Sequence, residues 1–264
     1  MPRALSCPYP VVGLTLMPLM LAACAAPDSP TSPRAERLES RVERLAEHDD
    51  DDDDAEGRST RVYDVTITNL TSGQPFSPGV LVTHTRAASV FRVGSRASEG
   101  LRLIAEDGNQ AAALAELTGR PGVFQVVDVN VPTGRLGGPL PTSRTFRIEA
   151  RANANRLSLV VMLICTNDGF TGLHSVRLPR SFSAQTFDAA GYDAGTEAND
   201  ERSTSIVDPC FAIGPTAGAA DGNARPATDG VVTHHPGIQG HADLVPAAHG
   251  WSNPVARITV QRVR

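Results

Sequence analysis

The chain has 264 residues and a formal net charge of −5 at pH 7, and its basic residues are all arginine. A mildly acidic chain without a basic stripe is a poor nucleic-acid binder, so we expect no nucleic-acid partner. The length suits one domain of about 100–200 residues plus a tail.

The first residues have the pattern of a bacterial lipoprotein signal peptide, which predicts a signal at residues 1–23. An apolar run from Val11 to Ala23 is too short and too rich in proline to span a bilayer, since a spanning helix needs about 20 apolar residues. Cys24 follows small residues that fit a cleavage pocket. We predict that Cys24 is lipidated and anchors the chain to the membrane. Because residue 25 is not aspartate, we expect an outer-membrane lipoprotein that is periplasmic or surface-exposed. An ordinary secretory signal with an incidental cysteine is the alternative.

Residues 24–60 are expected to form a disordered acidic tether. Leu38, Val42 and Leu45 recur at helical spacing, but fewer than two heptads are too few for a coiled coil. A short solvated helix is therefore favoured over an oligomerising one. The six consecutive aspartates at 49–54 repel one another and favour an extended spacer.

Residues 61–264 are predicted to form one β-rich domain. Alternation of apolar and polar residues is typical of half-buried strands, and a continuous aliphatic run is typical of a strand buried on both faces. The alternation predicts strands at 62–68, 124–131, 145–150 and 255–263, and the aliphatic run predicts a central strand at 157–164.

Helical signals are confined to residues 98–107 and 109–117, the second with Asn109 as its cap and Gly119 as its end. Residues 180–250 are rich in Gly, Pro, Asp and Asn, which predicts long loops. The expected fold class is therefore all-β, an antiparallel β-sandwich with a short helical insertion and long loops.

Common catalytic motifs are absent from the sequence, including the H-E-x-x-H helix, the G-x-S-x-G elbow and the phosphate-binding loop. We therefore predict that the protein is not an enzyme. Of the four cysteines, Cys7 lies in the signal and Cys24 is the lipid acceptor. Cys165 and Cys210 are left, and an oxidising compartment favours a disulfide between them.

Acidic residues gather at two points of the predicted domain. Asp168 follows the central strand, and Asp193 and Glu197 flank Gly195 about 25 residues later. Calcium takes about six to eight oxygen ligands, so these two segments could supply three carboxylates to one ion. Asp, Asn and Gly are also the residues of ordinary turns, so the pattern alone leaves the question open.

Histidines crowd near the end of the chain. They are His234, His235, His241 and His249, with Asp243 among them. Imidazoles suit zinc or copper, so a metal-dependent envelope hydrolase is an alternative function. Loop histidines also hydrogen-bond locally or face solvent.

Six sequence blocks, in this order, resemble the spondin amino-terminal domain family, here in a bacterial lipoprotein form. They are Phe-Ser-Pro-Gly at 76–79, Ala-Ser-Glu-Gly-Leu at 97–101, Ala-Glu-Asp-Gly at 105–108, Asp-Gly-Phe-Thr-Gly at 168–172, Tyr-Asp-Ala-Gly-Thr-Glu at 192–197 and Asn-Pro-Val-Ala-Arg-Ile-Thr-Val at 253–260. The resemblance covers about residues 61–264 and implies a β-sandwich related to calcium-dependent membrane-binding folds. In animal relatives this domain belongs to secreted matrix and adhesion proteins and carries a bound calcium ion.

The resemblance also implies the ligands of a calcium ion. The family's acids fall on Asp168, Asp193 and Glu197, where Glu197 replaces an aspartate of the family motif, and a glutamate of the preceding strand aligns with Glu149. The expected function is a lipid-anchored binding or adhesion-type module of the cell envelope, with an unknown extracellular protein or glycan as its ligand. A purely structural envelope protein is the remaining alternative.

Overall fold

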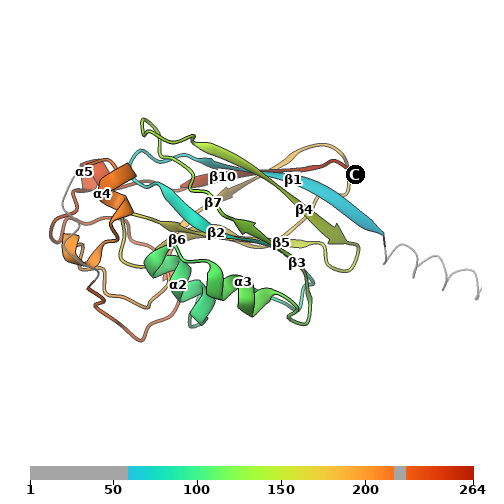
Figure 1. Cartoon of the computed structure of the whole chain (residues 1–264), viewed down its shortest axis with the longest axis horizontal. Helices are drawn as coiled ribbons and strands as arrows, with labels where there is room; N and C mark the ends of the chain where they lie inside the picture. Colours follow the sequence, from blue (N-terminus) through green and yellow to red (C-terminus); the bar gives the residue numbers. More distant parts are fainter. Residues whose placement is uncertain (1–58, 217–223) are drawn as a thin grey trace, which may run out of the picture. The chain divides into compact units, whose positions relative to one another are not determined.

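The structure, a computed structural model, describes residues 59–216 and 224–264 (Figure 1). The signal peptide, the lipidation site Cys24, the short helix and the aspartate run lie outside the described residues and stay predictions. None of the helices in these two ranges is long and apolar enough to cross a membrane.

Two antiparallel sheets form a sandwich, which confirms the predicted all-β class (Figure 1). One sheet has four strands in the order β4-β1-β10-β7, and the other has six in the order β3-β2-β5-β6-β8-β9. The strands are β1 (Thr60–Asn69), β2 (Phe76–His84), β3 (Val123–Val129), β4 (Ser143–Arg151), β5 (Arg156–Leu163), β6 (Gly169–Arg177), β7 (Gln185–Ala189), β8 (Gly191–Asp193), β9 (Thr233–His234) and β10 (Ala256–Arg262).

Both faces of the six-stranded sheet are buried. Leu81 and Leu159 belong to the core between the two sheets, whereas Val80 and Val160 belong to a second core beneath helices α2 (Glu99–Asp107) and α3 (Ala111–Leu117). Because the helices cover the outer face, the aliphatic run of β5 is buried on both sides, as the sequence predicts.

The two predicted helices are present, with one correction at a cap. Ser98 accepts a hydrogen bond from the Leu101 amide at 3.3 Å and begins α2. The N-cap of α3 is Gln110 and not Asn109, although the Asn109 side chain accepts a hydrogen bond from the Ala111 amide at 3.1 Å. Asn109 thus still satisfies a donor of the first turn, one residue further out than expected.

The predicted loop region of residues 180–250 contains short elements. Besides β7, β8 and β9, it holds a 3-10 turn (Ser203–Ser205) and helices α4 (Pro209–Ile213) and α5 (Pro246–His249). Helices α4 and α5 lie at the end of the sandwich where β5 finishes, whereas β7 runs along β10 in the four-stranded sheet (Figure 1).

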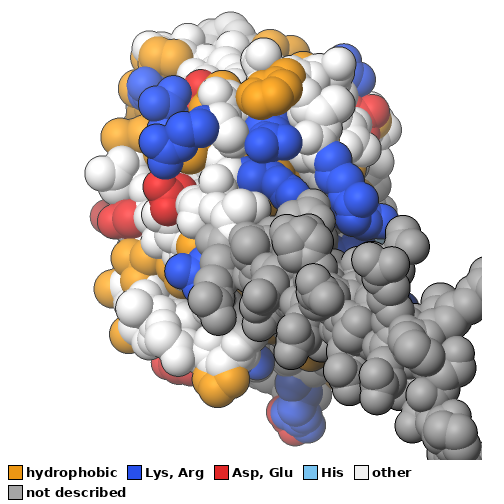
Figure 2. Space-filling view, turned by 90° about the vertical axis from the view of Figure 1, so that its right-hand side faces the viewer, with side chains coloured by type: hydrophobic (Ala, Val, Ile, Leu, Met, Phe, Trp, Pro, Cys, Tyr) orange, Lys and Arg blue, Asp and Glu red, His pale blue; other side chains and the backbone are white. Residues whose placement is uncertain are grey.

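Arginines lie at the opposite end of the sandwich, where β1 and β5 begin. Arg151, Arg177 and Arg262 end β4, β6 and β10, and Arg156 begins β5. Figure 2 shows arginine side chains gathered on this side of the molecule. The acidic residues that follow β5 and β8 lie at the other end.

Candidate metal site

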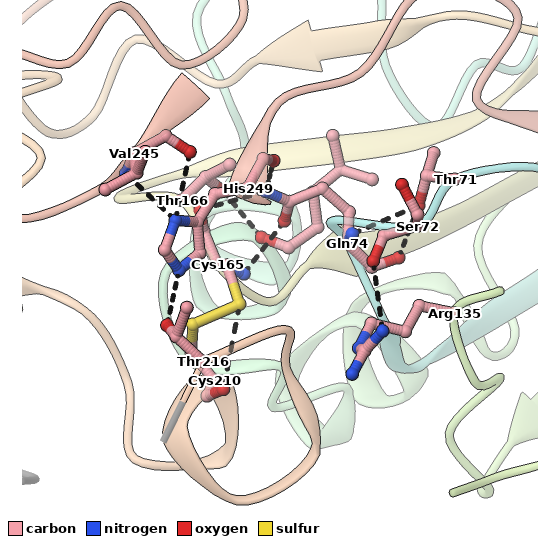
Figure 3. Close-up of a disulfide and its surroundings, with 11 residues drawn as sticks. Thr71, Ser72, Gln74, Arg135, Cys165, Thr166, Cys210, Thr216, Val245 and His249 are labelled. Carbon is pink, nitrogen blue, oxygen red and sulfur yellow. Dashed lines mark hydrogen bonds between the residues drawn. A yellow bond between two sulfur atoms is a disulfide. The ribbon is translucent and has the colours of Figure 1, made fainter. Parts of the chain in front are cut away.

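The loop that carries Asp168 is anchored by a disulfide (Figure 3). Cys165, shortly before Asp168, is bonded to Cys210 on α4, which confirms the predicted pairing. On its other side, the Cys165 amide donates to Gln74 Oε1 at 2.9 Å, and Gln74 Nε2 donates to the carbonyls of Cys165 and His249 at 3.1 and 2.7 Å. The loop between β5 and β6 is thus held from both sides.

Strand pairing brings the three central acids together. Gly169 of β6 pairs with Asp193 of β8, so Asp168 lies beside the end of β8. Asp168 Oδ2 accepts hydrogen bonds from the amides of Thr196 and Glu197 at 2.7 and 3.1 Å. The structure therefore brings the segments that carry Asp168, Asp193 and Glu197 together, and we call these three residues the acidic site.

A tight turn carries the chain from Asp193 to Glu197. Asp193 Oδ1 accepts a hydrogen bond from the Gly195 amide at 2.7 Å, and Oδ2 accepts one from Asn199 Nδ2 at 2.6 Å. Gly195 has a φ of +73°, and a Cβ there would come within 2.6 Å of the Val231 backbone. Only glycine fits this turn without strain.

The acidic site is almost fully buried and incompletely satisfied. Asp168, Asp193 and Glu197 are 0%, 8% and 3% exposed. Asp168 Oδ1 and Glu197 Oε2 have no hydrogen-bond partner within the described residues. A buried carboxylate oxygen without a partner is costly, and carboxylate oxygens are the ligands that calcium takes. The donor chemistry of the site therefore fits a hard cation.

Burial and mutual repulsion disfavour the charged forms of these acids. Burial, with a smaller contribution from the charge of Asp193, raises the pKa of Asp168 to about 6. Burial also raises the pKa of Glu197 to about 8, and the charges of Glu106 and Asp168 add to the shift. Such shifts mark a point where negative charge lacks compensation.

The side chains are not arranged as a ready coordination sphere. Within the described residues, no group of three His, Cys, Asp or Glu side chains stands in a metal-binding arrangement. The Asp193 oxygens bind Gly195 and Asn199, and Glu197 Oε1 accepts a hydrogen bond from Arg225 at 3.3 Å. An ion at this point would have to replace some of these contacts.

Glu149 is not part of the acidic site. It lies on β4 in the four-stranded sheet, and its carbonyl accepts a hydrogen bond from Thr83 Oγ1 at 2.6 Å. Thr83 pairs with Leu157 at the beginning of β5, whereas Asp168 follows the end of that strand. A strand of this length spans about 25 Å, so the structure does not bring Glu149 to the other three acids.

The first two C-terminal histidines point to different neighbours. The exposed ring of His234 packs on Tyr192, and the buried ring of His235 packs against Trp251, each with ring centroids 5.0 Å apart. His235 Nδ1 accepts a hydrogen bond from the Gly237 amide at 2.9 Å. Both imidazoles pack locally, but the buried Nε2 of His235 has no hydrogen-bond partner within the described residues. Burial lowers the pKa of His235, and the charges of Asp193 and Glu201 oppose this shift.

The other members of the histidine group are also separate. The amide of the exposed His241 donates to Glu201 Oε2 at 2.6 Å, and Asp243 Oδ2 accepts a hydrogen bond from the Ser203 amide at 2.8 Å. His249 is buried beside the disulfide, as Figure 3 shows. The structure does not gather the histidines and Asp243 into one site.

Three residues near the acidic site were not predicted from the sequence. Glu106 on α2 is 4% exposed, Arg225 contacts Glu197, and Asn199 holds Asp193. Glu106 belongs to a block that carries the family resemblance, but no pattern places it beside Glu197. Arg225 lies in a Gly-, Ala- and Pro-rich segment without a motif.

Comparison with known families agrees with this architecture. A family model described as Spondin_N matches residues 68–206, which is more than half of the chain and includes the whole acidic site. A search of curated proteins found no match. The suspected resemblance is confirmed: the chain belongs to the Spondin_N family.

Proposed function

We propose that the chain is a lipid-anchored binding or adhesion-type module of the bacterial cell envelope, without enzymatic activity, whose domain binds one calcium ion at the acidic site. The observation that carries the proposal is the pair of buried, unpartnered oxygens, Asp168 Oδ1 and Glu197 Oε2, in a Spondin_N domain. The lipid anchor and the outer-membrane location are supported by the Cys24 signal pattern.

The chemistry of the site supports calcium over softer metals. The unpartnered atoms of Asp168 and Glu197 are carboxylate oxygens, and hard cations prefer oxygen, whereas zinc and copper favour imidazole and thiolate. Asp168, Asp193 and Glu197 would hold the ion, and the ion would supply positive charge where burial disfavours bare carboxylates.

The position of the site suggests a structural role for the ion. Asp168 belongs to the disulfide-anchored loop after β5, and Asp193 and Glu197 belong to the turn after β8. A cation shared by these segments would fix the loops at one end of the sandwich. Loops held on a rigid scaffold are a common binding surface, and here we propose an extracellular protein or glycan as the ligand.

The hydrolase alternative gains no support from the histidine positions. An imidazole-bound catalytic metal needs several side chains around one open coordination position. The ring of His234 packs on Tyr192 instead, and His249 Nε2 shares a hydrogen bond with Thr216 Oγ1 at 2.9 Å.

Thermal unfolding of purified protein tests the calcium proposal. An ion that binds only the folded state stabilises it by about 2.7 kcal/mol at a hundredfold excess over Kd, or roughly 5–10 °C in Tm for a domain of this size. We expect calcium to raise the Tm and a chelator to lower it. Asp168→Asn and Asp193→Asn should lose most of this response, because each removes a ligand charge.

The matched control is Asp188→Asn, since Asp188 is half exposed and pairs with Arg257 at 2.9 Å on the four-stranded sheet. It should respond to calcium as the parent does. All variants carry serine in place of Asp49–Asp54, so that the aspartate run adds no binding. A parent Tm that ignores millimolar calcium, or stoichiometric zinc in the purified protein, would contradict the proposal.

A further inference from the structure

Arg225 lies against the acidic site and contacts acids from two elements. Its Nη1 is 3.3 Å from Glu197 Oε1 and 3.7 Å from Glu106 Oε2, and its Nη2 contacts Asp107. Glu197 and Glu106 are both almost fully buried, and the Arg225 side chain is 30% exposed. The guanidinium is thus partly withdrawn from water into an acidic environment.

Backbone pairing fixes the position of this arginine. The segment after Arg225 runs beside the segment that carries Glu197: Glu197 forms a β-bridge with Ala227, and the Ala198 amide donates to the Pro226 carbonyl at 2.8 Å. Main-chain pairing therefore holds Arg225 and Glu197 close to each other, so that their side chains can form this contact.

The electrostatics of the acidic site make this contact important. Without Arg225 the charged form of the buried Glu197 would lose its nearby cation, which disfavours that form. A divalent cation bound to Glu197 would lie close to the guanidinium, and like charges repel. Arg225 therefore favours the ion-free acidic site and disfavours binding of the ion.

We infer that Arg225 is a built-in counter-cation of the acidic site, which stabilises the ion-free domain and competes with calcium for Glu197. The inference rests on the proposed calcium site and adds its regulation. Glu197 is one methylene longer than aspartate, and this reach brings its carboxylate to the guanidinium. The competition should weaken calcium binding toward the range of extracellular modules, with a Kd of about 10⁻⁴–10⁻³ M.

Calcium titration and thermal unfolding of Arg225→Gln test the inference. Removing the competing charge should tighten calcium binding by about tenfold, within the usual range of coupling between two ligands of one site. In chelator at pH 8.5, the same variant should have a lower Tm than the parent, because the charged Glu197 loses a cation, whereas Glu106 keeps its ion pair with Arg102 at 2.6 Å. The matched control is Arg96→Gln. Arg96 pairs with the exposed Asp229, which lies in the same segment as Arg225. This control should change neither the calcium affinity nor the Tm in chelator.

Glu197→Asp provides a second variant that keeps Arg225 and its contacts with α2. The shorter side chain withdraws from the guanidinium, so calcium should bind more tightly than in the parent. When Glu197→Asp is combined with Arg225→Gln, calcium affinity should rise little further, because both changes break the same contact between Arg225 and Glu197 and their effects are not additive. This variant decides the question if Arg225→Gln does not fold.

The outcomes separate the two proposals. If the parent binds calcium and both variants bind it equally or more weakly, the counter-cation role is wrong while the calcium site stands. If neither parent nor variants bind calcium, the site itself fails and the competition with it. Calcium binding that appears only in the variants would support the competition most directly.

Discussion

At the scale of single residues, the acidic site combines buried carboxylates with few cations. Asp168 binds two backbone amides and still leaves one oxygen without a partner in the described part of the chain. Glu197 shares Arg225 with Glu106 and Asp107. Both acids therefore hold protons more tightly in the folded domain than in the unfolded chain.

This arrangement predicts a pH dependence of stability in chelator. The folded pKa values of about 6 for Asp168 and about 8 for Glu197 exceed the ordinary values of 3.8 and 4.5. The stability that these groups contribute is therefore fully present below pH 4 and is lost as pH rises through about 8. With calcium present the loss should shrink, and calcium should bind more tightly at higher pH because binding releases protons.

Comparing the parent with the double variant Asp168→Asn/Glu197→Gln isolates this effect. Burial lowers the pKa of His235 and His249, and these groups change stability with the opposite sign. The difference in Tm between parent and double variant, measured from pH 5 to pH 8.5 in chelator, removes their contribution. A difference that stays constant over this window would contradict the account.

The three acids of the acidic site could be predicted from the sequence, whereas their partners could not. Asp168, Asp193 and Glu197 stand in turn sequences that resemble a family motif, with Glu197 in place of an aspartate, so the local sequence was informative. Glu149 aligned with the motif, but the register of β4 places it at the far end of β5. Arg225 meets Glu197 through pairing between distant segments, which no local pattern encodes.

At the scale of elements, the disulfide joins the loop before Asp168 to α4. Cys165 and Cys210 are separated by 45 residues in the sequence. In the chain-entropy model, closing a loop of this length stabilises the fold by about 3–4 kcal/mol. The bond therefore stabilises the part of the domain that carries the acidic site.

Removing the disulfide should lower stability and weaken the calcium response together. Cys165→Ala with Cys210→Ala should lose about 3–4 kcal/mol in denaturant unfolding, because the unfolded chain is less restricted. The loop that holds Asp168 should also lose part of its order, so the Tm gain from calcium should shrink. Adding a reductant should destabilise the parent and leave the double variant unchanged; equal sensitivity of both would exclude this role.

The sequence patterns did not predict the two strands β2 and β6, which flank β5, and the reason is physical. β2 contains Gly79 and β6 contains Gly172, and glycine is unusual in strands. A Cβ on Gly79 would lie 2.0 Å from the Val160 carbonyl oxygen, and one on Gly172 would lie 1.8 Å from that of Leu159. These glycines allow β5 to approach closely on both sides, near irregularities in the register. Their role depends on pairing partners, which the local pattern does not contain.

At the scale of the whole molecule, the acidic site lies at the end of the sandwich opposite to the start of β1. The chain enters the domain at Thr60, where β4 ends at Arg151. The fold class followed from alternation and the aliphatic run of β5, but the strand order did not, because the first and last strands pair with each other. With a lipid anchor at the N-terminus, the acidic site would lie at the far end from the point of attachment.

The anchoring proposal predicts a clear change of location for Cys24→Ser. Without its thiol the chain accepts no diacylglycerol, so it should lose palmitate labelling and leave the membrane fraction. The disulfide variant described above serves as the control, because Cys165 and Cys210 should not affect labelling. Palmitate incorporation into Cys24→Ser would refute the lipoprotein assignment.

Calorimetric titration of the secreted chain, with Asp49–Asp54 replaced by serine, measures directly whether the acidic site holds one calcium ion. We expect one calcium ion per chain, with binding lost in Asp168→Asn and retained in Asp188→Asn. Absence of binding by the parent, or unchanged binding in Asp168→Asn, would contradict it.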